Sequence, residues 1–203
     1  MDICSHGQKT LAFIQLQVGR RPTRRSLAQI IVLAALTLSC LPAPAQDASP
    51  SSLAKLRSYV PISEHIATSG QPTDNQFAEI GKAGYAVLIN LSPPYVKLND
   101  REGFLATAAG MSYVQIPVEL KAPKMRDVEF FFSVVDANRD RKIFVHCESN
   151  LRTSVFVYLY RVIREGEDEA WARSALEQVW EPGGAWPAFI EAALKKYDRK
   201  QQR

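Results

Sequence analysis

Short apolar runs alternate with helical patterns along this chain, and that alternation limits the folds open to it. Residues 85–91 (YAVLINL) and 142–146 (KIFVH) have the length and the β-branched and aromatic content of buried strands. Residues 66–69 and 113–116 predict two more strands. Strands that alternate with helices form a mostly parallel sheet covered on both faces. We therefore expect an α/β fold, with a central, mostly parallel sheet of about four to five strands flanked by helices.

The predicted helices lie between and after these strands. The first begins at Thr73, where Gln76 stands three residues later and completes a capping box. The second spans residues 100–109 and is followed by Gly110, a residue typical of helix C-termini. Further helices are predicted at 125–138, 152–164, 168–180 and 186–196. In such folds ligands bind beyond the carboxyl ends of the strands, so the residues that follow strands are the first candidates for a site.

The first 45 residues have the layout of a secretory signal peptide. Arginines at 20, 21, 24 and 25 precede an apolar run over 27–41, and Ala43-Pro44-Ala45 then supplies a small-x-small cleavage signal. The apolar run is shorter than the roughly 20 residues of a membrane-spanning helix. We predict an exported, periplasmic protein with no stable membrane span. An alternative is a lipoprotein anchored through Cys40, which lies at the end of the apolar run.

The remaining chain predicts a single neutral domain. Residues 1–45 hold five basic side chains and one acid, so they account for the net charge of +4, and the rest carries 20 of each sign. A neutral body has no general attraction for polyanions, and we expect no nucleic-acid partner. The predicted parts after the signal peptide are a linker at 46–55, a domain at 56–198 and a polar tail at 199–203. The oligomeric state stays open.

Cys147 is the residue on which the predicted chemistry depends. The strand 142–146 delivers it into a tight turn that leads directly into the helix predicted at 152–164. The free N–H groups and dipole of a helix N-terminus favour both an anion and a thiolate. Arg152 at the far end of the turn can hold two oxygens of an oxyanion at once, and the Thr153 hydroxyl can donate a hydrogen bond to the sulfur.

This segment resembles the active-site loop of protein tyrosine and dual-specificity phosphatases, which reads His-Cys, five residues, Arg, then Ser or Thr. The turn at 69–72 (SGQP), the strand core at 87–91 (VLINL) and the segment 116–118 (IPV) agree with the same family. More narrowly, the chain is similar to a bacterial phosphatase-like group also found fused to metallo-β-lactamase-fold hydrolases. The resemblance covers roughly residues 59–189 and implies a cysteine-phosphatase-like domain that acts on phosphorylated or other anionic substrates.

The resemblance also implies roles for individual residues. Cys147 would be the nucleophile, His146 would orient the loop, and Thr153 would support the sulfur. The loop would bind phosphate through Glu148, Ser149, Asn150, Leu151 and Arg152. Relatives place an acidic residue on a loop after an earlier strand to protonate the leaving oxygen. Here the matching loop is 117–123, and Glu119 is its only acid.

Two departures from the family pattern keep other functions open. Only four residues separate Cys147 from Arg152, so the loop is one residue shorter than usual, and Asn150 stands where a glycine is usual. The first hypothesis is a phosphoester hydrolase acting through a phosphocysteine intermediate on a protein phosphotyrosine or phosphoserine, or on a small molecule. The second is a rhodanese-like sulfurtransferase that carries a persulfide on Cys147, which the loop length favours. The third is a non-catalytic, anion-binding pseudophosphatase. No cofactor is expected, and because no histidine cluster can be assembled, no metal is predicted.

Overall fold

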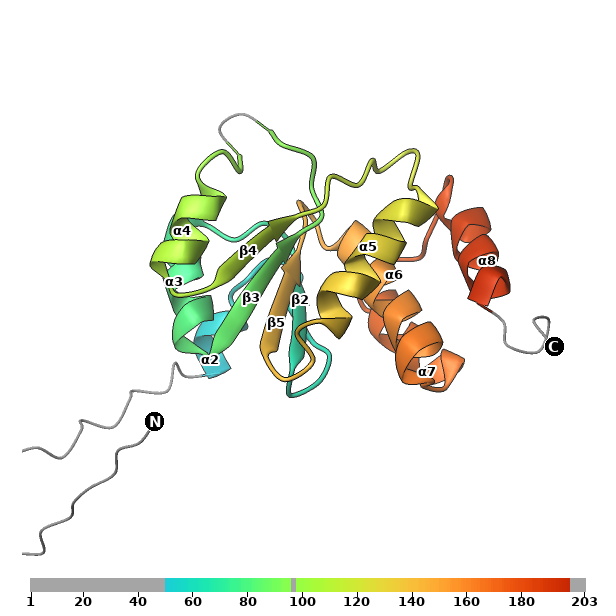
Figure 1. Cartoon of the computed structure of the whole chain (residues 1–203), viewed down its shortest axis with the longest axis horizontal. Coiled ribbons are helices and arrows are strands. Elements are labelled where there is room, and N and C mark those ends of the chain that lie inside the picture. Colours follow the sequence, from blue (N-terminus) through green and yellow to red (C-terminus); the bar gives the residue numbers. More distant parts are fainter. Residues whose placement is uncertain (1–49, 96–97, 198–203) are drawn as a thin grey trace, which may run out of the picture. The chain divides into compact units, whose positions relative to one another are not determined.

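The sheet of the domain has five strands in the part of the chain that the structure, a computed structural model, describes, which is residues 50–95 and 98–197 (Figure 1). Their order is β1-β2-β5-β3-β4. The strands are β1 (Val60–Pro61), β2 (Ile66–Ser69), β3 (Tyr85–Asn90), β4 (Ser112–Gln115) and β5 (Lys142–His146). β1 is antiparallel to β2, and every other pair is parallel. The predicted mostly parallel α/β sheet is therefore confirmed.

Helices cover both faces of this sheet (Figure 1). One face carries α2 (Pro50–Leu53), α3 (Asp74–Lys82) and α4 (Glu102–Ala108), and the other carries α5 (Met125–Asp136), α6 (Leu151–Tyr160), α7 (Glu169–Glu177) and α8 (Trp186–Tyr197). Successive side chains of β3 point to opposite faces of the sheet. Leu88 packs in the hydrophobic cluster of the first face, and Val87 and Ile89 pack in that of the second. The capping box predicted at the start of α3 forms, since the Thr73 N–H donates to Gln76 Oε1 over 2.9 Å.

Two segments differ from their predictions. A helix covers the predicted range 152–164, but α6 ends at Tyr160 and the chain continues as a π-helix, η1 (Arg161–Glu165). A π-turn takes in one extra residue, and it begins at the buried Arg161, whose Nη1 donates to the Ala172 carbonyl over 3.3 Å. The predicted linker, 46–55, contains α2, and Leu53 is buried in the core. The predicted signal peptide, residues 46–49 and the polar tail lie outside the described residues.

The final residues of four strands form one row across the carboxyl edge of the sheet. His146 at the end of β5 pairs in register with Ser69 of β2 and with Asn90 of β3, and Asn90 pairs with Gln115 of β4. All four side chains are polar, although most strand residues before them are apolar. Cys147 follows directly after this row, so the sheet sets the position of the predicted nucleophile.

Candidate active site

The backbone of the cysteine loop is held by the turn that follows β2. The Cys147 N–H donates to the Ser69 carbonyl over 3.4 Å, and the Gln71 N–H donates to the Glu148 carbonyl over 3.1 Å. Gly70 and Ser149 form an isolated antiparallel bridge between these two contacts. A side chain at Gly70 would place its Cβ 3.1 Å from the Glu148 carbonyl oxygen, which explains a glycine here. The loop is therefore fixed from outside, with the Cys147 side chain fully buried.

Asn150 makes the turn into α6 possible. Its φ of 65° lies in the left-handed region, where asparagine is tolerated better than most residues. The Asn150 amide donates to the Ser58 carbonyl over 2.7 Å and to Thr68 Oγ1 over 3.1 Å. Asn150 thus supplies the backbone shape of a glycine and also ties the loop to the segments around β1 and β2.

Arg152 lies in the first turn of α6 with only 3% of its surface exposed. No carboxylate of the residues that the structure describes pairs with it, and its Nε has no hydrogen-bond partner among them. Its Nη2 donates to the Tyr95 hydroxyl over 3.5 Å, a long contact. The buried Thr153 Oγ1 is likewise unpartnered within the described ranges. Buried polar groups are nearly always hydrogen-bonded, so this pair of donors is suited to an oxyanion.

The loop also presents main-chain donors. The first helical hydrogen bond of α6 runs from the Ser154 N–H to the Asn150 carbonyl, so the N–H groups of Leu151, Arg152 and Thr153 precede the ladder. Such groups bind anions at helix N-termini. The Glu148 side chain is exposed, whereas Ser149 and Leu151 are half-buried. The predicted phosphate-binding residues therefore contribute to one continuous loop.

Glu119 lies on an exposed part of the neighbouring loop, after β4. That loop is anchored by Trp186, whose indole N–H donates to the Leu120 carbonyl over 2.9 Å. Leu120 and Lys121 line one side of a pocket of about 340 Å³, and Leu151 of the cysteine loop lines it too. The two loops that the sequence assigned to catalysis thus border the same pocket.

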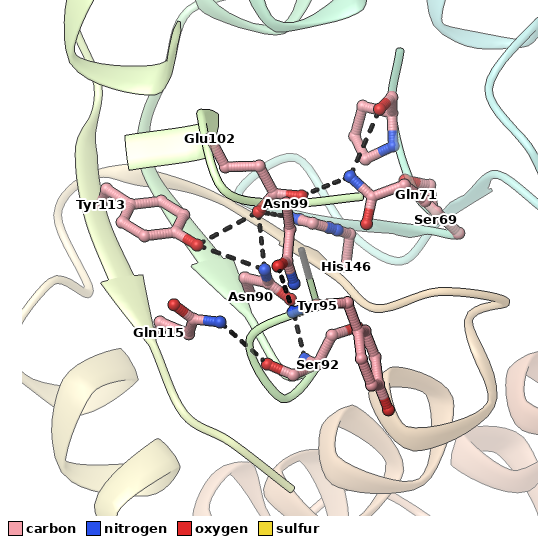
Figure 2. Close-up of polar contacts among 12 residues, drawn as sticks. Ser69, Gln71, Asn90, Ser92, Tyr95, Asn99, Glu102, Tyr113, Gln115 and His146 are labelled. Carbon is pink, nitrogen blue, oxygen red and sulfur yellow. Dashed lines mark hydrogen bonds and ion pairs between the residues drawn. The ribbon is translucent and has the colours of Figure 1, made fainter. Parts of the chain in front are cut away.

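A buried carboxylate that the sequence did not single out lies beside His146, the residue before Cys147. Glu102, the first residue of α4, is 2% exposed (Figure 2). It accepts hydrogen bonds from Asn90 Nδ2 over 2.6 Å, from the Tyr113 hydroxyl over 3.1 Å and from Gln71 Nε2. His146 Nε2 lies 3.4 Å from Glu102 Oε2, and the His146 ring is fully buried. From the sequence, Glu102 is only an acidic residue in the first turn of a helix, where acids commonly interact with the helix dipole.

The partners of Glu102 decide its ionisation. Burial acts to raise the pKa of this carboxyl group, but the neighbouring His146 ring opposes that effect. Gln71 and Tyr113 also donate hydrogen bonds to it, and together these contacts hold the pKa of Glu102 below its ordinary value of 4.5. Burial by itself raises the pKa of Tyr113, and the neighbouring carboxylate raises it further. Glu102 is therefore a buried anion with a neutral phenol beside it.

Neither a metal site nor a membrane span emerges from the described structure. Within residues 50–95 and 98–197, no group of three or more His, Cys, Asp or Glu side chains could hold a metal ion. In those same ranges, no helix combines the length and apolar character that a membrane-crossing segment needs.

Comparison with known proteins identifies a match over most of the described domain. Residues 60–185 match the family described as a DSP-PTPase phosphatase fused to NAD+ kinase. Two curated proteins from strains of Xylella fastidiosa, each named Beta-lactamase hydrolase-like protein, are 33% identical over 108 residues, which is 51% of this chain and 25% of each relative. The chain thus spans about a quarter of the length of these curated relatives.

Solved structures share the fold. A candidate phosphatase (DUF442) from Shewanella putrefaciens CN-32 has 33% sequence identity and a TM-score of 0.66, with 72% of this chain and 97% of that chain covered. TpbA from P. aeruginosa, solved in complex with pTyr, is 17% identical with a TM-score of 0.53, covering 72% of this chain and 88% of that one. At that identity, the second likeness concerns the fold alone.

Proposed function

Because the chain belongs to the DSP-PTPase phosphatase family, and is thus a phosphoester hydrolase, we propose that it cleaves phosphate monoesters through a phosphocysteine intermediate on Cys147. The observation that carries this proposal is Arg152, a buried guanidinium without a carboxylate partner among the described residues, at the other end of the loop from the thiol. A phosphoryl group seated there would receive the guanidinium and the N–H groups of the helix start.

The reaction has two steps. The Cys147 thiolate attacks phosphorus, the bond from phosphorus to the ester oxygen breaks, and Glu119 gives its proton to the departing oxygen. Water then attacks the phosphocysteine with its proton taken by Glu119, which releases inorganic phosphate and restores the thiolate. Arg152 and the loop amides stabilise the charge on the equatorial oxygens in both steps.

The pocket beside the loop favours a substrate with an apolar group next to its phosphate. Leu120, Leu151 and the half-buried Trp180 line it, and Lys121 adds a cation. An aryl phosphate, including a phosphotyrosine side chain, fits this chemistry better than a short polar ester.

The test is an assay of the purified protein against nitrophenyl phosphate, a phosphotyrosine peptide and glycerol phosphate. We expect release of inorganic phosphate, with the two aryl esters hydrolysed at higher kcat/KM. Absence of turnover on all three, with isotherms that still show phosphate binding, would favour the anion-binding alternative.

Sulfur transfer is the second candidate, and the loop of six residues from Cys147 to Arg152 favours it. In that reaction thiosulfate gives its outer sulfur to the Cys147 thiolate and leaves as sulfite, and cyanide then takes the sulfur from the persulfide. Formation of thiocyanate in an assay with thiosulfate and cyanide would support this candidate, and its absence alongside phosphatase activity would exclude it.

We further propose that the domain works outside the cytoplasm after cleavage behind Ala45. The support is the order of basic, apolar and Ala-Pro-Ala segments within residues 1–45. Intact-mass analysis of the protein from the periplasm should give a chain that begins at Gln46. A full-length mass, or a lipid-modified chain that begins at Cys40, would contradict this proposal.

A further inference from the structure

Glu102 is a buried carboxylate with polar contacts to four other residues. It belongs to α4, a segment that has no part in the proposed reaction. Its partners are Gln71, Asn90, Tyr113 and His146, which come from the turn after β2 and the strands β3, β4 and β5 (Figure 2). Gln71 donates to Oε1, whereas Asn90 and Tyr113 donate to Oε2, which also lies 3.4 Å from His146 Nε2. Residues from four segments of the chain therefore hold this carboxylate.

Burial by itself opposes the charge of Glu102, and its polar neighbours outweigh that effect. Neither Lys nor Arg pairs with it in the part of the chain that the structure describes, and the residue is 2% exposed. Removing a carboxylate from water is strongly unfavourable, and apolar residues in place of buried ion pairs are often neutral or stabilising. The cluster thus calls for an explanation beyond packing.

Two of the four contacts reach the residues on either side of Cys147. His146, the residue before the cysteine, has its Nε2 beside the carboxylate at 3.4 Å. Gln71 donates through its side-chain amide to the same carboxylate, and its backbone N–H donates to the carbonyl of Glu148, the residue after the cysteine. One anion therefore connects to both flanks of the nucleophile.

The other two contacts fix the anion itself. Asn90 donates to Glu102 while its Oδ1 accepts from the Ser92 N–H over 2.7 Å, which defines the chain leaving β3. The Tyr113 hydroxyl reaches both Glu102 and Asn90. These contacts hold the carboxylate against β3 and β4.

We propose that Glu102 is a positioning residue for Cys147, which acts through the His146 ring and the Gln71 side chain to hold the cysteine loop in its reactive shape. The proposal rests on the function proposed above for the cysteine. Glu102 Oε2 lies 3.4 Å from His146 Nε2, and Phe77 of α3 packs against the His146 ring edge-on.

The main test is Glu102→Gln, which keeps the shape and removes the charge. We expect kcat on nitrophenyl phosphate to fall on the order of 10- to 100-fold, the usual cost of misplacing a reacting group by about an ångström, with KM nearly unchanged. The rate of Cys147 alkylation by iodoacetamide should fall too, and its dependence on pH should change. Glu177→Gln on the exposed end of α7 is the matched control and should change neither.

Tyr113→Phe separates positioning from packing. It removes one hydrogen bond from the carboxylate but leaves the contacts to His146 and Gln71 intact. We expect a lower melting temperature, with a smaller fall in kcat and a smaller change in the alkylation profile than in Glu102→Gln. If Tyr113→Phe lowered kcat as much as Glu102→Gln, or if folded Glu102→Gln kept wild-type kcat and alkylation, the proposal would be overturned.

Two further measurements keep the test decisive. If Glu102→Gln does not fold, Gln71→Met replaces it, because it removes one link to the loop and leaves the backbone N–H in place; unchanged kcat would then overturn the proposal. If the wild-type protein hydrolyses no phosphoester, the proposed function fails by itself, and the alkylation profile of Cys147 still decides whether Glu102 positions the thiol.

Discussion

Charged side chains at the two edges of the sheet differ in whether they form ion pairs. At the carboxyl edge, Arg152 is 3% exposed and pairs with no carboxylate of the described residues. At the amino edge, Asp136 at the end of α5 pairs with Arg139 over 2.6 Å and with Arg164 of η1, and these side chains are partly exposed. Exposed pairs that satisfy one another contribute little and need nothing further. The guanidinium without an internal partner, rather than the best-paired one, lies at the edge where we propose that the reaction takes place.

Replacing the nucleophile should have the largest effect. In Cys147→Ser the loop keeps its shape, but a hydroxyl is a far weaker nucleophile than a thiolate, so phosphate release should fall by roughly 10⁴-fold or more. The measurement is phosphate release under single-turnover conditions, with thermal melting to verify the fold. Full activity in this variant would remove the carboxyl edge from the mechanism altogether.

Matched arginine replacements test the comparison directly. Arg152→Lys keeps the charge but loses the planar fork, so kcat/KM should fall about 10²- to 10³-fold, as for the loss of an oxyanion donor. Arg164→Lys makes the same change at the amino edge and should alter kcat/KM less than about twofold. Equal losses in the two variants would mean that the difference between the edges has no catalytic meaning.

The proposed role of Glu119 as the general acid can be tested by comparing two classes of substrate. If the exposed Glu119 is the general acid, Glu119→Gln should slow hydrolysis of alkyl phosphates by about 10²-fold, because their leaving groups need a proton. Nitrophenyl phosphate has a stabilised leaving group and should lose less than about threefold. Similar losses on both substrates would exclude Glu119 from proton transfer.

Asn150 should affect stability more than chemistry. In Asn150→Ala the left-handed backbone and two lost hydrogen bonds should together lower the free energy of unfolding by about 2–3 kcal/mol. Asn150→Gly tolerates the φ of 65° and loses only the side-chain bonds, so about 1 kcal/mol is expected. Urea unfolding of both variants measures the difference; equal losses would show that the backbone conformation costs alanine nothing.

The smallest expected effect concerns pH. Because the folded-state pKa of Glu102 lies below its ordinary value of 4.5, its charge stabilises the fold fully above that value, and this contribution disappears as pH falls through the folded value. The difference in unfolding free energy between wild type and Glu102→Gln should therefore shrink from about pH 7 to about pH 3. A difference that stays constant over this range would mean that the ionised form gains nothing from its partners.

Local patterns were enough to predict four of the five strands of the described domain, and they placed Cys147 and Arg152 at the two ends of one loop. A strand, a tight turn and a helix start follow one another within residues 142–152, so local rules of strand and helix formation apply. Local patterns could not predict the role of Glu102, because its partners at 71, 90, 113 and 146 meet only when the sheet assembles. The π-turn at Arg161 was missed for a similar reason, since it depends on a contact with α7.

The position of β5 in the strand order has a consequence for how the domain opens. β5 lies third of five, with parallel partners on both sides, whereas β4 is an edge strand. Local openings of a protein start where few neighbours hold the backbone, and central strands exchange their amide protons last. The strand that carries the cysteine loop therefore belongs to the slowest-exchanging part of the domain. Local opening of β1 and β4 can occur while the base of the loop stays closed, so fluctuation of the edge strands leaves Cys147 in place.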